Sequence, residues 1–277
     1  MKHLVTFLVT FLVTLSAFAQ DGCLPMRNVD SSGLPYQAGE RLMFTIHYKW
    51  GSINADVCKA SMVLDQTVLN GEAVFNARLI GRTDKFYDMF FKVKEDFRSW
   101  FTVDGLRPRK FIRDTHEGGY FAYDVYRYDW NQKVIHAALN NKKRGERQIE
   151  IPLSACSYDL PALIYYARNM DFSKIKDGGK YPLSFAIDDD VFTITLTYLG
   201  KENKRIRGIG TIRCLKFRCG VVAGEVFDSD DEDAVMWFTD DDNRIPVLFQ
   251  APVFHGFAIG RLYAYNGLKH EFSSLLQ

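Results

Sequence analysis

The sequence predicts an all-β, mainly antiparallel protein: a strongly curved sheet or incomplete β-barrel wrapped around one principal α-helix at about residues 159–170. Three observations support this fold class. Apolar and polar residues alternate through most of the chain, which is typical of half-buried strands. Pairs such as Asn70-Gly71 separate the alternating segments and favour tight hairpins. The 22 Phe and 14 Tyr residues also favour strands.

The first strands form a predicted meander. Residues 42–50 alternate between apolar and mostly polar side chains, and Gly51 ends this strand. Residues 53–69 form a second extended segment, which Asn70-Gly71 connects to a third at 72–80. Asn and Gly tolerate the positive φ angles of a two-residue turn, so we expect three neighbouring antiparallel strands here.

Four more strands are expected before residue 140. Asp104-Gly105 and Gly118-Gly119 mark turns between them. The segment 83–92 fits two structures, because its aromatic residues have helical spacing but could also cover the open end of a core. The polar, basic segment 140–147 is expected to be a solvated loop. The strands are predicted at 96–103, 109–115, 120–130 and 134–139.

One helix is predicted from its start and its periodicity. Asp159 is a suitable N-cap, and Pro161 stands in the first turn, where a missing N–H is harmless. Apolar residues then recur at helical intervals, so we expect this face to pack on the inner face of the sheet. They are Leu160, Leu163, Ile164, Ala167 and Met170.

The remaining chain returns to strands. Asp188, Asp189 and Asp190 form a predicted hairpin loop. We expect one domain over residues 20–277, with a possible sub-division near 140–180. The strands are predicted at 181–187, 191–199, 210–217, 221–227, 235–239, 245–250 and 259–265.

Residues 1–19 have the order of a cleavable signal peptide. Lys2 precedes the apolar run Leu4–Leu15, and Ala17-Phe18-Ala19 offers small residues before a cut at Gln20. The run is shorter than the roughly 20 residues that a membrane span requires. A lipoprotein signal ending at Cys23 is disfavoured by Asp21. We therefore expect an exported protein with no transmembrane segment after cleavage. The sequence has no Asn-x-Ser/Thr sequon, which favours a bacterial protein of the periplasm or outer cell envelope over a eukaryotic secreted one.

Charge and cysteine content narrow the possibilities further. Without Lys2, 34 basic residues face 34 acidic ones, so no electrostatic case exists for nucleic acid. The five cysteines, an odd number, leave at least one unpaired. Cys214 and Cys219 are five residues apart in a predicted strand and should not bond to each other.

No motif for catalysis, a metal or a cofactor is found. The acidic clusters at 228–233 and 240–242 lack EF-hand spacing and fall at expected turns, although calcium binding is an alternative. The histidines have no metal-ligand spacing. We expect no cofactor and no metal site.

Large apolar side chains are the more informative feature. An open or wide barrel leaves space for a ligand, whereas an ordinary sheet core would bury the same residues without one. The candidate ligand-binding residues are Trp50, Phe90, Phe91, Tyr123, Tyr126, Trp237 and Phe249.

Several ordered segments resemble one bacterial family; they are 39–42, 50–51, 117–120, 158–168, 214–217, 222–227 and 237–246. They span most of the chain after residue 20, and their order is more specific than any single piece. The resemblance is to the exported proteins of the domain of unknown function 3108, which have no established activity. It implies a mostly antiparallel envelope protein from a Bacteroides-like bacterium, similar in fold to envelope proteins with strongly curved sheets, including lipoprotein carriers.

Three functions remain open. The first is non-enzymatic binding of an apolar or amphipathic ligand, or of an envelope partner, along the concave face. The second is a polysaccharide hydrolase using a carboxylate pair such as Glu40 with Asp240. The third is a structural or assembly protein that offers an edge strand to a partner. The expected partners are a lipid, a glycan or another envelope protein.

Overall fold

The computed structural model describes residues 26–27, 30–222, 233–253 and 256–276. The predicted signal peptide lies outside these residues, as does most of the acidic cluster 228–233. None of the helices in the described segments has the length and apolar character that a membrane crossing requires.

The strands fall into two runs along the chain, separated by one α-helix, α1 (Leu160–Arg168). Short 3₁₀ turns lie at Ser31–Gly33, Tyr87–Met89 and Phe172–Lys174. The first run is β1 (Arg41–Trp50), β2 (Ile53–Leu69), β3 (Glu72–Thr83), β4 (Val93–Thr102), β5 (Pro108–Glu117), β6 (Tyr120–Asp129), β7 (Val134–Asn141) and β8 (Gly145–Pro152). The short strand β9 (Ser157–Tyr158) directly precedes α1. The second run, after the helix, is β10 (Lys180–Ile187), β11 (Asp190–Ile206), β12 (Gly210–Val222), β13 (Ala234–Thr239), β14 (Pro246–Pro252), β15 (Phe257–Asn266) and β16 (Leu275–Leu276).

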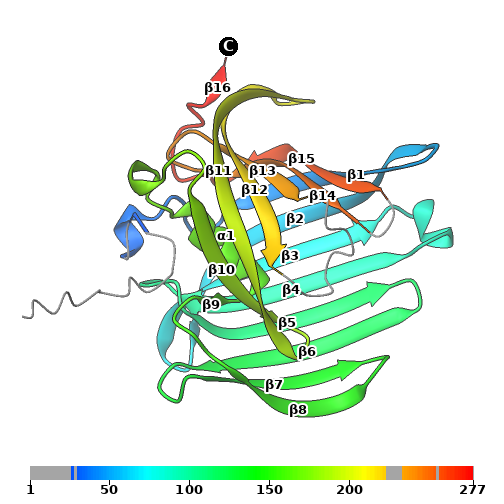
Figure 1. Cartoon of the computed structure of the whole chain (residues 1–277), viewed down its shortest axis with the longest axis vertical. Helices are drawn as coiled ribbons and strands as arrows, with labels where there is room; N and C mark the ends of the chain where they lie inside the picture. Colours follow the sequence, from blue (N-terminus) through cyan, green and yellow to red (C-terminus); the bar gives the residue numbers. More distant parts are fainter. Residues whose placement is uncertain (1–25, 28–29, 223–232, 254–255, 277) are drawn as a thin grey trace, which may run out of the picture.

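All of these strands belong to one sheet. Its order is β8-β7-β6-β5-β4-β3-β2-β1-β15-β14-β13-β12-β11-β10-β9, and β16 pairs with β12. Neighbours are antiparallel except the short parallel pair β9 and β10. In the described chain β8 and β9 are the two ends of this order and do not pair with each other. The sheet therefore curls but does not close (Figure 1). The predicted all-β, mainly antiparallel class is confirmed.

The predicted hairpin turns have the backbone angles they require. Asn70 and Gly71 have φ values of 52° and 83° between β2 and β3. Gly105 (φ 74°) turns the chain between β4 and β5, and Asp188 (φ 53°) does so between β10 and β11. Asn, Asp and Gly are the residues that adopt this conformation most readily, so local chemistry determines these connections.

The predicted loop at 140–147 was wrong. Strand β7 continues to Asn141 and β8 begins at Gly145, leaving a three-residue turn. The Asn141 carboxamide oxygen accepts from the backbone N–H groups of Lys143 and Arg144, which closes the turn locally. Because β8 is an edge strand with several exposed residues, a polar sequence is compatible with strand pairing there.

Two strands of the second run are longer than predicted. Strand β11 continues past residue 199 to Ile206, because a register shift between Tyr198 and Lys201 absorbs Gly200 (φ 93°). A glycine in a strand pattern can mark such a bulge rather than an end. The separate strand predicted at 221–227 was also wrong in its start, since Val221 and Val222 continue β12; residues 223–227 lie outside the described segments.

Helix α1 begins as predicted and is buried nearly all round. The Asp159 carboxylate caps it by accepting from the Ala162 N–H at 2.9 Å and from the Ser99 hydroxyl at 2.7 Å. The helix ends at Arg168, with Asn169 as C-cap, slightly earlier than expected. It contacts β3, β4 and β10. Tyr165 and Tyr166 are buried, like most apolar residues of the predicted helix face.

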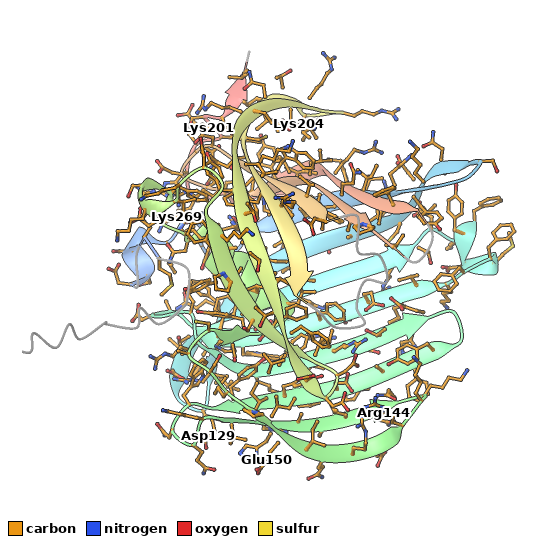
Figure 2. All side chains as sticks on the ribbon, in the orientation of Figure 1. Asp129, Arg144, Glu150, Lys201, Lys204 and Lys269 are labelled. Carbon is orange, nitrogen blue, oxygen red and sulfur yellow. The ribbon has the colours of Figure 1, made fainter. Side chains whose placement is uncertain are left out.

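The curl of the sheet brings distant strands together. In Figure 1, β10 to β12 cross in front of the broad array formed by β2 to β8. Ala186 and Val191, from β10 and β11, pack against an apolar cluster contributed by β5 to β8. The turn after β10 adds polar contacts, because Arg113 donates to Asp188 at 2.6 Å. Arg144, labelled in Figure 2 near the β7–β8 turn, pairs with Asp189.

Candidate functional site

The described residues contain an apolar cavity of about 230 Å³. Four adjacent strands, β1 to β4, supply most of its wall. Ile164 of α1 and residues of β13 and β14 supply the remainder. The lining residues are Phe44, Ala60, Ser61, Met62, Leu79, Ile80, Gly81, Glu95, Phe97, Ile164, Met236, Pro246 and Phe249.

Small residues in register create the space. Phe44, Ala60, Gly81 and Glu95 lie directly opposite one another across β1 to β4. Paired positions share one face of a sheet, so Ala60 and Gly81 leave a hollow between larger neighbours. A second row, formed by Met62, Leu79 and Phe97, supplies the adjacent apolar wall.

The position of Phe249 depends on a glycine in the neighbouring strand. Phe249 of β14 pairs with Gly260 of β15. An added Cβ at Gly260 would lie 1.9 Å from the Phe249 Cε1 atom, so the ring covers bare backbone. The absence of a side chain at residue 260 therefore allows Phe249 to reach the cavity.

Glu95 is the acidic residue in the cavity lining. Its Oε2 atom accepts a hydrogen bond from the Thr115 hydroxyl at 2.7 Å. Its Oε1 atom is buried and has no hydrogen-bond partner in the described part of the chain. Burial raises the pKa of Glu95 to about 7; the Thr115 hydrogen bond and the charge of Arg113 oppose this rise, and nearby Glu117 adds to it. A carboxyl group with a perturbed pKa in a cavity is a candidate binding group.

The structure does not bring the seven predicted ligand residues together. Phe249 alone lines the cavity. Trp237 is buried beneath Lys204 and Lys216, whose ammonium groups lie 4.3 and 5.5 Å from its ring centre. Tyr126 is buried in the second apolar cluster, where its hydroxyl donates to the Asp188 carbonyl at 3.0 Å.

The other predicted ligand residues lie away from the cavity lining. Phe90 and Phe91 are exposed at the β3–β4 connection, and Tyr123 is half exposed on β6. Trp50 ends β1, and its side chain is outside what the structure describes.

Sequence reasoning missed the residues that make the cavity. Ala60, Gly81 and Glu95 are remote in sequence and become neighbours only through strand register. One sequence feature could have indicated the place, because a glycine within a strand, such as Gly81 in β3, often marks a close approach of other groups.

The predicted hydrolytic pair is engaged elsewhere. Glu40 is completely buried, and both of its oxygens accept from the Arg168 guanidinium at 2.5 and 2.7 Å. Asp240 accepts from Lys201 at 2.9 Å and from Arg213 at 3.1 Å. Neither carboxylate faces the cavity, so this geometry does not favour a hydrolase that uses them.

The acidic segment 240–242 shows turn chemistry. Asp241 accepts from the Thr239 hydroxyl, the Ser274 hydroxyl and the Asn243 N–H within 2.7–3.1 Å. These bonds fix the connection between β13 and β14. No cluster of three or more metal-ligating side chains occurs in the described segments.

Cys214 and Cys219 both lie on β12 and are not bonded to each other, as their strand spacing predicted; both are free. Cys58 is also free, on β2, next to the cavity wall residue Ala60. Burial raises the pKa of the Cys58 thiol to about 11, so this thiol stays protonated at neutral pH.

Comparison with one solved structure supports the fold. A β-barrel-like protein of the domain of unknown function DUF1849 from Brucella abortus is similar, with a TM-score of 0.53 and 11% sequence identity, covering 84% of this chain and 99% of that one. A protein with a YmcC-like fold from Bacteroides fragilis matches with a TM-score of 0.35 and 10% identity, covering 88% of this chain and 100% of that one.

No curated protein matches the sequence. A family model does match, and it covers residues 43–260, from β1 to β15. This range includes the whole cavity wall and α1. The chain therefore belongs to the DUF3108 family of proteins of unknown function.

Proposed function

We propose that this protein is a non-enzymatic binder of a small apolar or amphipathic molecule in the cell envelope. In this proposal the curled sheet surrounds α1, and the ligand occupies the cavity between β1–β4, α1 and β13–β14. The cavity carries the argument. Its volume of about 230 Å³ exceeds the roughly 150 Å³ of an engineered apolar cavity that takes up benzene.

The composition of the wall supports binding rather than catalysis. Apolar ligand sites are lined mainly by hydrophobic side chains with a few placed polar groups. Here Phe44, Met62, Leu79 and Phe97 provide the apolar surface, and Glu95 provides a polar group. A second carboxylate at a glycosidase-like distance would support hydrolysis, but Glu40 and Asp240 are engaged in ion pairs elsewhere. Glu117 lies within hydrogen-bond reach of Glu95, which is closer than the roughly 5–10 Å between the two carboxyl groups of a glycosidase.

The edge of the sheet argues against a structural protein that pairs an edge strand with a partner. Strand β8 ends the sheet order and carries Glu146, Arg147 and Glu150, followed by Pro152. Charged residues and proline on an edge strand discourage pairing with another chain.

Binding is tested by titrating the purified protein with n-octanol, using isothermal calorimetry or ligand-observed NMR. Ala60→Leu fills the hollow and should weaken octanol binding at least tenfold. Ala73→Leu is the matched control, because it makes the same change at an exposed position of β3. Equal octanol affinity in both variants, or no binding of octanol, octylamine or octanoate by the wild type, would refute the proposal.

A lipid surface is a second candidate partner, which one exposed segment favours. Phe86, Met89 and Phe90, in the connection between β3 and β4, are 62%, 73% and 74% exposed, and Lys85 and Lys92 flank them. Large exposed apolar clusters usually mark interaction sites. A short connection offers less area than the roughly 800 Å² per partner of a stable protein interface, so insertion into a bilayer surface suits it better.

Co-sedimentation with phosphatidylcholine vesicles tests this second candidate. The wild type should bind, and the variant Met89→Ser/Phe90→Ser should bind at least fivefold less. Val68→Ser, at an exposed position of β2, is the control and should bind as the wild type does. Vesicle binding that is unchanged in the double variant would contradict this role.

A further inference from the structure

The carboxyl group of Glu95 is only half satisfied. It lies on β4 between Gly81 of β3 and Thr115 of β5. Thr115 donates to Oε2, whereas Oε1 is buried without a hydrogen-bond partner in the described residues. A buried acceptor left unpaired is unfavourable, so a ligand that donates a hydrogen bond to Oε1 would recover that loss.

Arg113, whose charge acts on Glu95, is already neutralised by other groups. The Arg113 guanidinium donates to Asp188 at 2.6 Å and lies 3.5 Å from Asp124. Its Nε donates to the Thr115 hydroxyl at 3.1 Å, so it reaches Glu95 only through Thr115. Arg113 therefore does not supply a free positive charge to the cavity.

The remaining charge beside Glu95 has the same sign. Glu117, two positions after Thr115 on β5, lies within hydrogen-bond reach of the Glu95 carboxyl. Two ionised carboxylates repel each other, so this contact forms only when one of them is protonated, and it favours the neutral form of Glu95. Ile164, Met236 and Phe249, from α1, β13 and β14, contribute only apolar side chains. The polar end of the cavity thus has a surplus of negative charge when Glu95 is ionised, and it carries an open acceptor.

We infer that the cavity selects an amphipathic molecule whose polar end is a primary amine, with the ammonium group donating to Oε1 of Glu95 and the apolar part filling the hollow over Ala60 and Gly81. This inference rests on the proposed binding function and specifies its ligand class. An alcohol can donate the same hydrogen bond without the charge attraction. A carboxylate is repelled by Glu95 and Glu117. Charge-assisted hydrogen bonds are about twice as strong as neutral ones, so the order of affinity is amine, alcohol, carboxylate.

Three probes with the same chain test this order: n-octylamine, n-octanol and n-octanoate, titrated calorimetrically at pH 7.5. Octylamine should bind at least tenfold more tightly than octanol, and octanoate more weakly than either. Glu95→Gln should reduce octylamine affinity at least tenfold and change octanol affinity less than threefold. Glu150→Gln, at an exposed carboxylate of β8, is the matched control and should alter neither.

The pH dependence gives a second readout, which needs no variant. The titratable groups facing Glu95 are Arg113 and Glu117 on β5 and Cys58 on β2. Arg113 and Cys58 keep their charge states between pH 6 and 8, because the pKa of each is raised. Octylamine affinity should rise up to about tenfold over this range as Glu95 ionises, while octanol affinity should not rise.

The outcomes separate this inference from the proposed function. If octanol binds in an Ala60-dependent way but octylamine has no advantage, or keeps it in Glu95→Gln, the amine preference is wrong and the binding function stands. If none of the three probes binds the folded wild type, both are wrong. If Glu95→Gln does not fold, the wild-type affinity order and pH dependence decide the question.

Discussion

The Arg168 guanidinium donates to both oxygens of Glu40, at 2.5 and 2.7 Å, and both side chains are completely buried. The two residues are 128 positions apart in the chain. Arg168 also donates to the Asn243 carbonyl at 3.0 Å and lies about 5 Å from the ring centres of Tyr36 and Tyr165. One ion pair thus connects the end of α1, the entrance to β1 and the turn after β13.

Removing one member of this pair should destabilise the fold strongly. Arg168→Met leaves the Glu40 carboxylate buried without its cation, which should lower the free energy of unfolding by about 3–5 kcal/mol. Adding Glu40→Leu should recover part of this loss, because a buried pair is often replaceable by apolar groups. Urea denaturation of the two variants measures both effects.

The control for this pair is Arg27→Gln, which removes an exposed ion pair with Asp242 and should change stability by less than about 1 kcal/mol. A loss below 1 kcal/mol in Arg168→Met would show that the pair is not required for stability.

Burial should also increase the loss of stability when the N-cap of α1 is removed. Asp159→Ala removes the cap and leaves the Ser99 hydroxyl buried without its acceptor. The expected loss is about 2–4 kcal/mol, combining a cap and an unsatisfied polar group. Asp171→Ala removes a similar cap at an exposed 3₁₀ turn and should lower stability by about 1 kcal/mol or less. Similar losses in thermal and urea unfolding of both variants would contradict this argument.

Glu95 should make stability depend on pH. Its pKa is raised from 4.5 to about 7, so between these values the folded protein binds more protons than the unfolded chain. This contribution is therefore most favourable below pH 4.5, declines as pH rises to about 7 and is constant above. The stability difference between Glu95→Gln and the wild type should therefore change with pH. On going from pH 4.5 to pH 8 it should shift in favour of Glu95→Gln by about 1–2 kcal/mol.

Urea denaturation at pH 4.5, 6 and 8 measures this difference, with Glu150→Gln as the exposed control. A difference between Glu95→Gln and wild type that is the same at all three pH values would exclude a raised pKa.

Local chemistry explains what the sequence could predict. Asn70-Gly71 and the Asp159-to-Pro161 helix start act within a few residues, and the structure contains both. The sheet class follows from alternation, which is also local. The Glu40–Arg168 pair could not be predicted, because burial of two opposite charges depends on which segments the curl brings together.

The cavity could not be predicted from the sequence for the same reason. The sequence predicts aromatic residues as its lining, yet Phe90 and Tyr123 are exposed and Tyr126 fills a different cluster. A hollow arises where small residues align across strands, and that alignment depends on register between β2, β3 and β4. A one-residue slip would turn Ala60 or Gly81 to the other face.

The turn after β10 should hold the curl of the sheet. Asp188 accepts from Arg113, whose side chain is nearly buried, whereas Asp189 pairs with the more exposed Arg144 and Arg147. Asp188→Asn keeps a residue that tolerates the positive φ angle but removes the charge. It should lower stability by about 1–3 kcal/mol and speed hydrogen exchange in β10 and β11. Asp189→Asn should change stability by less than about 1 kcal/mol. Equal effects of the two changes would mean that the Asp188–Arg113 contact does not hold the curl of the sheet.

Two glycines in the sheet should respond oppositely to the same substitution. At Gly260 a Cβ would lie 1.9 Å from the Phe249 ring, so Gly260→Ala must displace that ring from the cavity wall. Overpacking of this kind lowers stability by about 1–3 kcal/mol. At Gly81 a Cβ would lie 3.6 Å from the Glu95 Cβ, an ordinary contact, so Gly81→Ala should be neutral or stabilising by up to about 1 kcal/mol.

The double variant Gly260→Ala/Phe249→Ala separates the clash from other effects. If the ring is the obstacle, adding Gly260→Ala to Phe249→Ala should have almost no further effect on urea denaturation, although Phe249→Ala itself lowers stability. Octanol affinity should fall in Gly260→Ala, because the displaced ring no longer bounds the cavity. An unchanged affinity combined with a full additive loss of stability would mean that Phe249 and Gly260 act independently, and that the ring over the glycine does not shape the site.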